Sequence, residues 1–147
     1  MKWVTRENAN VDRVACPWLI RRFVDPSSEF FYVPAAEVLT VAQQQGAIPY
    51  DVPNVELGHV DGRCSFESII LKYDLSGDPA LVALAQVVHA ADVEGALSES
   101  PFGPGLKAIA HGFKDLFGKD DLRKVELESP IYEALYTYFQ HELNTAP

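Results

Sequence analysis

The stretch KWVTRENANVDRVACPWLIRRFVDPSSEFFYV, residues 2–33, predicts a strand, a helix and a second strand in succession. Residues 2–5 and 29–33 carry β-branched and aromatic side chains, which are typical of short strands. Between them, an Asn or Asp near Val11 can cap a helix, and the proline after Asp25 ends it, because a residue before proline avoids the helical region. This order places a β-sheet in the N-terminal third of the chain.

Pro17 lies inside the predicted helix and leaves two arrangements open. Proline lacks a backbone N–H, and its ring clashes with the preceding turn. In the first arrangement, a single turn over residues 12–15 precedes a helix that begins at Pro17, and Cys16 is the N-cap. In the second arrangement, one helix is kinked at Pro17. The two arrangements place the Cys16 thiol in different surroundings.

The rest of the chain is predicted to be mainly helical. The pair Asp78-Pro79 is the clearest start signal, because aspartate caps a helix and proline fits its first position. Helices are predicted over residues 35–45, 65–73, 78–93, 106–117, 120–127 and 129–143, with an extended edge segment at 47–53 and a loop at 98–105. We therefore predict an α+β fold, a mostly helical single domain over residues 1–147 with a small N-terminal β-sheet.

The composition is that of a globular protein with an acidic surface. The 147 residues are 48% hydrophobic and 22% charged, with a formal net charge of −9. This charge argues against nucleic acid and membrane partners, because anionic partners are bound through Lys and Arg. Two cysteines are too few for a disulfide scaffold, and no apolar run resembles a signal peptide or a membrane span. We therefore expect a cytoplasmic protein.

Two pairs of candidate metal ligands share a spacing of three residues. Glu56 and His59 form one pair, and His89 and Asp92 form the other. On a helix this spacing puts both side chains on one face, although the glycine between Glu56 and His59 also fits a loop. Two imidazoles and two carboxylates suit one divalent metal ion, such as Zn, Fe or Mn. The alternative is that His59 caps a loop and that His89 is a polar residue on a buried helix.

Cys16 and three arginines form a second candidate group. If Cys16 is an N-cap, the helix dipole and the neighbouring cations lower its pKa, which makes it a candidate catalytic nucleophile. Arg13, Arg21 and Arg22 would also attract an oxyanion. The alternatives are a buried structural cysteine and arginines that pair with surface carboxylates. Cys64 is distinguished only by a neighbouring histidine and arginine.

Five segments of the chain carry a family resemblance: KWVTRE, VDRVACPWLIRRFVDP, FFYVP, GAIPYDVPNVELGHVDGRCSFESIILKY and VVHAADV. In this order, over nearly the whole chain, they resemble the C-terminal domain of the chromate-resistance protein family. The resemblance implies a link to chromate-resistance operons. Some longer members of that family have an additional N-terminal region and act as chromate-responsive regulators. The family name does not assign a chemistry to the domain.

Two functions from different classes fit these residues. The first is a cytoplasmic metal-binding accessory or sensor domain linked to chromate resistance, with an arginine-lined region that attracts an oxyanion such as chromate. The second is a thiol- or metal-dependent redox enzyme that acts on chromate or on its damage products. A third interpretation is a module that docks on another chain through its aromatic C-terminal helix. The sequence leaves the oligomeric state open, a homo-oligomer included.

Overall fold

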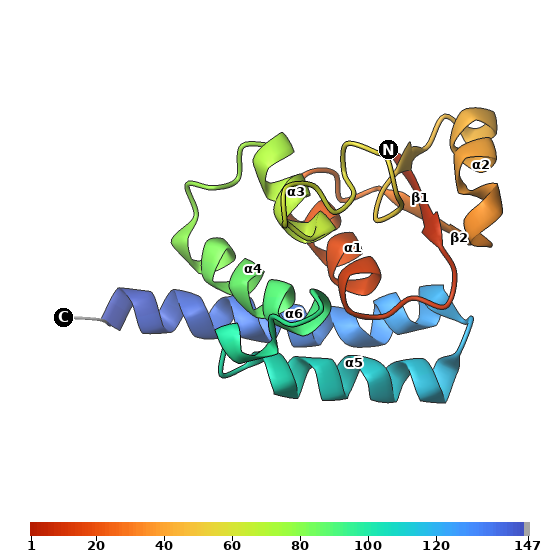
Figure 1. Ribbon diagram of the computed structural model, residues 1–147. Helices are drawn as coiled ribbons and strands as arrows, with labels where there is room; N and C mark the ends of the chain where they lie inside the picture. Colours follow the sequence, from red (N-terminus) through yellow and green to blue (C-terminus); the bar gives the residue numbers. More distant parts are fainter. Residues whose placement is uncertain (146–147) are drawn as a thin grey trace.

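The computed structural model describes residues 1–145, and within this range it contains six α-helices, two short 3-10 helices and three strands. In chain order (Figure 1), the elements are β1 (Lys2–Arg6), α1 (Val11–Phe23), β2 (Glu29–Val33), η1 (Ala35–Glu37), α2 (Val38–Gln45), β3 (Ile48–Pro49), α3 (Ser65–Lys72), α4 (Pro79–Asp92), η2 (Leu97–Glu99), α5 (Gly103–Phe117) and α6 (Asp121–Thr145). The predicted fold, mostly helical with a small N-terminal sheet, is confirmed. Across the described residues, the helices lack the combination of length and apolar character that spanning a bilayer requires.

The three strands form one parallel sheet in the order β2-β1-β3. β1 and β2 pair along their whole length, beginning with Lys2 opposite Glu29. β3 adds only Ile48 and Pro49 on the other side of β1. Proline is tolerated in β3 because an edge strand has one side without a pairing partner. Both predicted strands are therefore confirmed, and the predicted edge segment contributes a short third strand.

Helices α1 and α2 pack on opposite faces of this sheet (Figure 1). Successive strand residues point to opposite faces, so Trp3 joins the main core with α1, whereas Val4 packs with Val38 of α2. The chain passes from β1 through α1 to β2, and then through α2 to β3 on the far side of β1. The strand order therefore reverses between β1 and β3. In open parallel sheets, ligands bind beyond the carboxyl ends of the strands at such a point.

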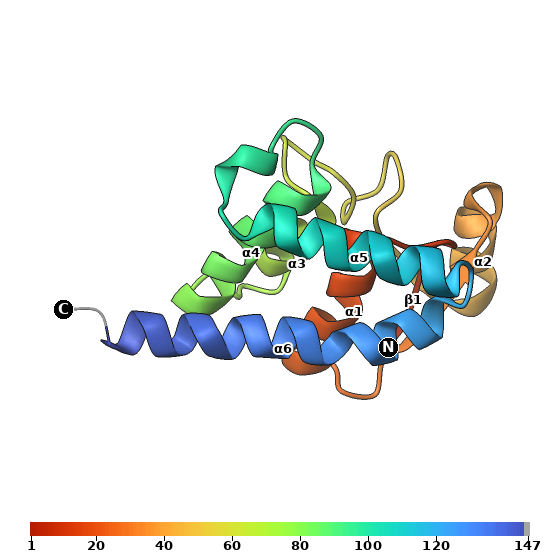
Figure 2. The same cartoon turned by 90° about the horizontal axis from the view of Figure 1, so that it is seen from below.

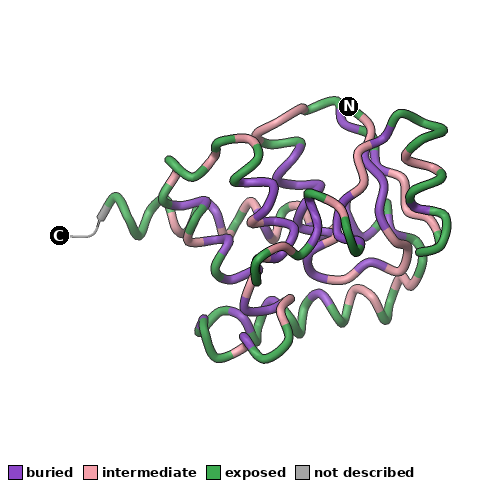
Figure 3. Tube along the Cα trace, turned by 45° about the horizontal axis from the view of Figure 1, so that its top comes forward, coloured by how far each residue is buried: buried purple, intermediate pink, exposed green. Residues whose placement is uncertain are grey.

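The other helices form a layer on the side of α1 that faces away from the sheet. α5 and α6 run beside each other along this side (Figure 2), and α6 contacts both α1 and α4. Buried residues concentrate in α1, β1 and α4, whereas exposed residues follow α2 and the outer sides of α5 and α6 (Figure 3). Trp18, Phe66 and Tyr132 join this core from three different helices. α1 is thus the central helix of the molecule.

α1 is one helix that continues through Pro17. Proline leaves the carbonyl four residues earlier, that of Arg13, without its helical N–H partner. The Tyr32 hydroxyl donates to this carbonyl at 2.5 Å, and the Tyr50 hydroxyl lies 3.4 Å from it. Side chains from the sheet thus replace the hydrogen bond that proline removes. The arrangement with Cys16 as an N-cap is wrong, because Cys16 is buried in the middle of the helix.

Two helix boundaries in the C-terminal half differ from the prediction. α5 begins inside the predicted loop, where Gly103 packs so closely on α4 that an added Cβ would lie 2.9 Å from the Ala90 Cβ. α6 is one helix rather than two and continues through Pro130. Buried side chains on both sides of this proline, such as Val125 and Tyr132, hold the helix against the core. Tertiary packing therefore outweighs the local breaking signals.

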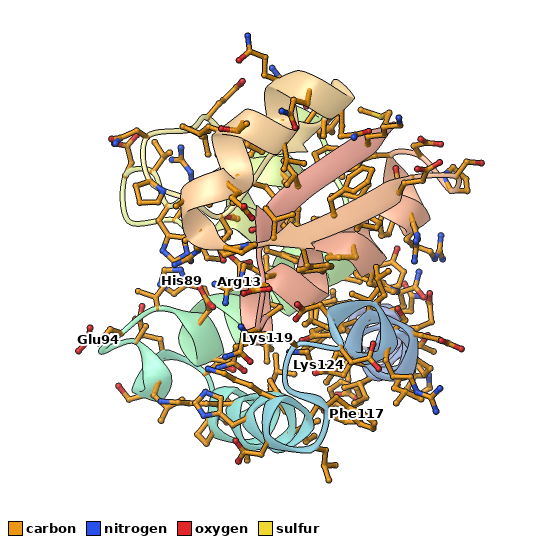
Figure 4. All side chains as sticks on the ribbon, turned by 90° about the vertical axis from the view of Figure 1, so that its right-hand side faces the viewer. Arg13, His89, Glu94, Phe117, Lys119 and Lys124 are labelled. Carbon is orange, nitrogen blue, oxygen red and sulfur yellow. The ribbon has the colours of Figure 1, made fainter. Side chains whose placement is uncertain are left out.

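A buried ion pair attaches the start of α6 to the loop after β1. Lys124 is fully buried (Figure 4), and its ammonium donates to the carbonyls of Ala9 at 2.7 Å and Gly118 at 2.6 Å. The same ammonium lies 3.0 Å from the carboxylate of Asp121. Asp121 in turn accepts the backbone N–H groups of Asn8 and Ala9. Because this loop leads into α1, the pair fixes where the central helix begins.

Glu128 is a further buried ionisable group on α6, and it gives a pH-dependent prediction. Only 1% of this residue is exposed, and its Oε1 has no hydrogen-bond partner. Burial raises the pKa of its carboxyl from 4.5 to about 7, and the nearby Lys124 charge only partly opposes this. The folded protein therefore holds a proton that the unfolded chain has already lost, so stability falls as the pH rises through this window.

We expect Glu128→Gln to remove the loss of stability that rising pH causes through this carboxyl. Relative to wild type, the variant should gain on the order of 3 kcal/mol of unfolding free energy between pH 4.5 and pH 8, measured by urea unfolding. Glu126→Gln, at an exposed position of the same helix, is the matched control and should show no such gain. An identical pH dependence for wild type and Glu128→Gln would contradict the prediction.

Candidate metal centre

Three aspartates and one histidine meet beyond the carboxyl ends of β1 and β3. Asp12 lies in the first turn of α1, which follows β1, and Asp51 follows β3 closely. His59 belongs to the loop between β3 and α3, and Asp92 is the last residue of α4. This location is the reversal point of the strand order, where the fold is expected to bind ligands.

Asp12 is buried and joins the first turns of two helices. Its carboxylate accepts the backbone N–H of Ser65 at 2.7 Å and that of Phe66 at 3.0 Å, both at the start of α3. The first N–H groups of a helix have no partner within the helix, and they favour a negative charge. Asp12 therefore serves α3 as a cap supplied by another helix. One of its oxygens also lies 3.5 Å from His59 Nε2.

The loop that carries His59 is held in a fixed shape by Gly58. An added Cβ at this glycine would come within 2.6 Å of the Val52 carbonyl oxygen, so the loop requires glycine here. The carbonyl of Gly58 accepts a hydrogen bond from the Ser68 hydroxyl of α3 at 3.0 Å. The next residue, His59, is thereby placed with its Nε2 3.1 Å from a carboxylate oxygen of Asp51.

Asp92 completes the group from the end of α4. Its Oδ2 lies 3.1 Å from His59 Nε2, and its Oδ1 accepts the backbone N–H of Asp12 at 3.3 Å. Asp92 thus contacts both the loop and the first turn of α1. One imidazole nitrogen is surrounded by carboxylates from three separate elements of the fold.

The electrostatics of this group favour a cation. Burial raises the pKa of the Asp12 carboxyl to about 7, although the hydrogen bond from His59 acts in the opposite direction. Hydrogen bonds to Asp12, Asp51 and Asp92 raise the pKa of the His59 imidazole to about 12. Arginines reach only one edge of the group, where Arg13 lies 3.5 Å from Asp51. The centre of the group therefore favours a positive charge, which either the protonated imidazole or a bound metal ion can supply.

The distances also suit a metal ion. Two ligand atoms that lie about 2.1 Å from one ion, at right angles, are about 3.0 Å apart. The distances from His59 Nε2 to its three carboxylate neighbours are 3.1, 3.1 and 3.5 Å. The ligand atoms of Asp12, His59 and Asp92 all lie within 4.8 Å of one another. An ion at their centre would replace the proton on the imidazole, as metal binding generally does.

A pocket of about 320 Å³ opens beside His59. Its lining consists of Arg6, Asp51, Val52, Pro53 and His59. The His59 side chain is 45% exposed, whereas that of Asp12 is fully buried. The group is therefore closed on the side of α1 and accessible from the side of the loop.

A second group of ligand-type side chains lies nearby. Cys64, Glu67 and His89 bring one ligand atom each within 4.8 Å of one another. His89 Nδ1 is 2.6 Å from Glu67 Oε1. Cys64 is the N-cap of α3, and Glu67 bonds back to its N–H in a capping box. His89 and Asp92 therefore lie one turn apart on α4 but belong to different groups.

The four ligands predicted from the sequence do not meet at one point. The structure brings His59 and Asp92 together, but His89 pairs with Glu67 instead. Glu56 is exposed and pairs with Lys72 at 2.9 Å, so it points to a different partner. The first predicted pair lies on a loop rather than a helix, and a loop does not keep side chains three residues apart on one face.

The three arginines of the predicted anion region contact different groups. Arg13 pairs with Asp51. Arg21 donates to the Ser28 carbonyl at 3.2 Å and lies over the Phe30 ring. Arg22 is 3.2 Å from Glu133 of α6. Arg13 lies at the start of α1, whereas Arg21 and Arg22 lie in its last turn, so the three side chains do not form one region.

The two thiols lie in the interior rather than in a cationic environment. Cys16 and Cys64 are both free and buried. Burial, reinforced by the neighbouring Asp12 carboxylate, raises the pKa of each thiol. The opposite shift is expected for a helix N-cap beside arginines, so the physical basis for Cys16 as a nucleophile is absent.

The sequence pattern assigns no ligand role to Asp12, Asp51 or Glu67. Asp12 and Asp51 follow strands whose parallel pairing became clear only from the structure, since β3 has just two residues. A signal for them does exist: each is an aspartate within a few residues of a strand end. Glu67 is the third helical residue after Cys64, the typical position of a capping-box glutamate.

Comparisons with known proteins identify the family. The family described as ChrB, C-terminal domain matches residues 3–139 of the chain. The chain is 32% identical, over 139 residues, to Protein ChrB of Cupriavidus metallidurans, and this alignment covers 94% of the chain and 40% of that protein. No solved structure matches the chain. The resemblance in the sequence motifs is thus confirmed, and the chain belongs to the ChrB C-terminal domain family.

Proposed function

We propose that the chain is a metal-binding accessory or sensor domain linked to chromate resistance, in which Asp12, His59 and Asp92 hold one divalent cation and Asp51 lies beside it. The observation that carries the proposal is the position of His59 Nε2, which lies 3.1 to 3.5 Å from carboxylate oxygens of three aspartates. Two of these aspartates, Asp12 and Asp51, are buried. Carboxylates that approach each other in the interior repel strongly unless a cation lies between them.

The protein's own cations are distributed unevenly over this cluster. Arg6 and Arg13 approach Asp51 at 3.8 and 3.5 Å. Among residues 1–145, neither Asp12 nor Asp92 has a lysine or arginine within 4 Å, and each depends on His59 for a positive charge. A divalent cation adds one more charge than the proton it displaces. It also binds several oxygens at once, which a single imidazole N–H cannot do.

The ligand set indicates the kind of metal. The sequence alone leaves Zn, Fe and Mn open. Two carboxylates and one imidazole are mostly oxygen donors, which suit Mn²⁺ better than Zn²⁺. The pocket at His59 leaves a side of the ion open to water or to an added ligand. An oxyanion such as chromate would enter there, next to Arg6.

A sensor role would follow from the elements that the cation joins. The ligands come from α1, from the loop after β3 and from the end of α4. Binding would therefore hold the loop against the two helices, and release would free it. The chain spans about two fifths of the length of its curated relative. In a longer protein, the remaining part could respond to the position of this loop.

Thermal unfolding with and without metal tests the proposal. At Mn²⁺ about 100-fold above the dissociation constant, bound cation stabilises the folded state by about 2.7 kcal/mol. For a chain of this size, that corresponds to a rise in Tm of about 5–10 °C over the chelator-treated protein. We expect His59→Ala and Asp92→Asn to lose this rise.

Glu56→Gln is the matched control, because Glu56 lies in the same loop but pairs with Lys72 outside the cluster. It should retain the full response to Mn²⁺. An unchanged Tm in wild type across added Mn²⁺, Fe²⁺ and Zn²⁺ would refute the proposal. So would an equal metal response in wild type, His59→Ala and Asp92→Asn.

A further inference from the structure

The second group of ligand-type side chains lies at the N-terminus of α3. Cys64 is fully buried, while the side chains of Glu67 and His89 are 25% and 21% exposed. His89 belongs to α4 (Figure 4), and its Nδ1 contacts Oε1 of Glu67 on α3. Its other ring nitrogen lies 3.9 Å from Glu99 Oε2, on η2. A thiol, an imidazole and a carboxylate therefore share one partly open position.

Helix capping accounts for the positions of Cys64 and Glu67 but not for that of His89. A capping box requires only the Cys64 and Glu67 positions. His89 comes from a different helix, and its imidazole has a carboxylate beside each nitrogen. An imidazole that binds a metal through one nitrogen commonly donates its other N–H to a carboxylate. Glu99 stands in the position for that second role.

We propose that Cys64, Glu67 and His89 form a second metal site, separate from the aspartate cluster and selective for Zn²⁺ over harder cations. Thiolate and imidazole ligands favour Zn²⁺, whereas the aspartate cluster contains no sulfur. Four-coordinate Zn²⁺ would take these three ligands and a water as the fourth. Binding displaces the thiol proton, which is released to solvent.

The geometry requires a small adjustment. Oxygen and nitrogen ligands of tetrahedral Zn²⁺, each about 2.0–2.1 Å from the ion, are about 3.4 Å apart. Glu67 Oε1 and His89 Nδ1 are 2.6 Å apart as a hydrogen bond. Metal entry therefore exchanges this hydrogen bond for two metal bonds and moves the flexible Glu67 side chain by roughly 1 Å. Glu67 also bonds to the Cys64 N–H, so the capping box opens at the same time.

Co²⁺ is a suitable probe, because a bound thiolate gives it an intense charge-transfer absorption in the near ultraviolet that oxygen and nitrogen ligands do not give. We expect this absorption when Co²⁺ is added to the metal-free full chain, and we expect Zn²⁺ to remove it by displacement. Cys64→Ser should abolish the band. Because serine is itself a preferred N-cap, this variant keeps the start of α3. His89→Gln should weaken Co²⁺ affinity by about 10- to 100-fold.

Two control variants distinguish this site from the other buried thiol and from the aspartate cluster. Cys16→Ser removes the other buried thiol and should leave the band unchanged. Asp92→Asn removes a ligand of the aspartate cluster and should also leave the band, so failure of the proposed function and failure of this site are distinguishable. Absence of the band in wild type, or its loss in Cys16→Ser with retention in Cys64→Ser, would overturn the proposal. Circular dichroism of each variant confirms that it is folded.

Discussion

Asp12→Ala is expected to destabilise the metal-free protein by about 3–5 kcal/mol, measured by urea unfolding in the presence of a chelator. The Asp12 carboxylate accepts the buried N–H groups of Ser65 and Phe66 and lies next to His59. Alanine leaves both N–H groups without a partner and removes a counter-charge of the imidazole. Each unsatisfied buried group costs about 1–3 kcal/mol.

Asp12→Asn separates the structural from the metal-binding role of this side chain. Asparagine has the same shape and keeps one acceptor oxygen, so we expect it to lose less stability than alanine. It lacks the carboxylate charge, so the response to Mn²⁺ should weaken. Asp115→Ala, on the outer part of α5, is the control and should change stability by less than about 0.5 kcal/mol. Equal small effects for Asp12→Ala and Asp115→Ala would show that Asp12 does not support α3.

Lys124→Met is expected to cost a similar amount, about 3–5 kcal/mol of unfolding free energy. Methionine has nearly the same length but no charge or donor. The Asp121 carboxylate then remains buried without its cation, and the carbonyls of Ala9 and Gly118 lose their donor. These groups attach α6 to the loop that leads into α1. The loss should therefore appear as lower global stability in urea.

Lys119→Met is the matched control for this substitution. Lys119 lies five residues earlier and pairs with Glu7 at 3.1 Å, but its side chain is 71% exposed. Exposed ion pairs contribute about 0–1 kcal/mol, because water screens them and because two long side chains must be ordered. If Lys124→Met and Lys119→Met lower the unfolding free energy equally, the buried pair does not stabilise the fold as predicted.

Local sequence signals predicted most of the fold. Asp78-Pro79 marks the start of α4 correctly, since Asp78 accepts the Leu81 N–H at 3.1 Å. Prolines were the residues hardest to interpret: Pro17 left two arrangements open, and Pro130 was wrongly predicted to separate two helices. Pro17 and Pro130 both lie inside helices, because distant partners compensate for them: Tyr32 for Pro17, and core packing for Pro130. The sequence of the helix alone does not reveal these distant partners.

The candidate site was predictable only in part. The spacing of His89 and Asp92 predicts one shared site, whereas the structure places them in two separate groups of ligand-type side chains. Asp12 is distant from His59 along the chain and meets it only because β1 and β3 are parallel neighbours. Periodicity reports the neighbours of a residue within one element. It does not report which elements come together.

The most direct test of the proposed metal centre is an anomalous difference map from crystals grown with MnCl₂. The diffraction data are collected at X-ray energies chosen to identify manganese. The account predicts one strong peak within about 2.2 Å of His59 Nε2 and of carboxylate oxygens of Asp12 and Asp92. The peak should be absent from crystals of Asp92→Asn grown in the same way. A wild-type map without density between these side chains, with His59 still hydrogen-bonded to the three aspartates, would contradict the account.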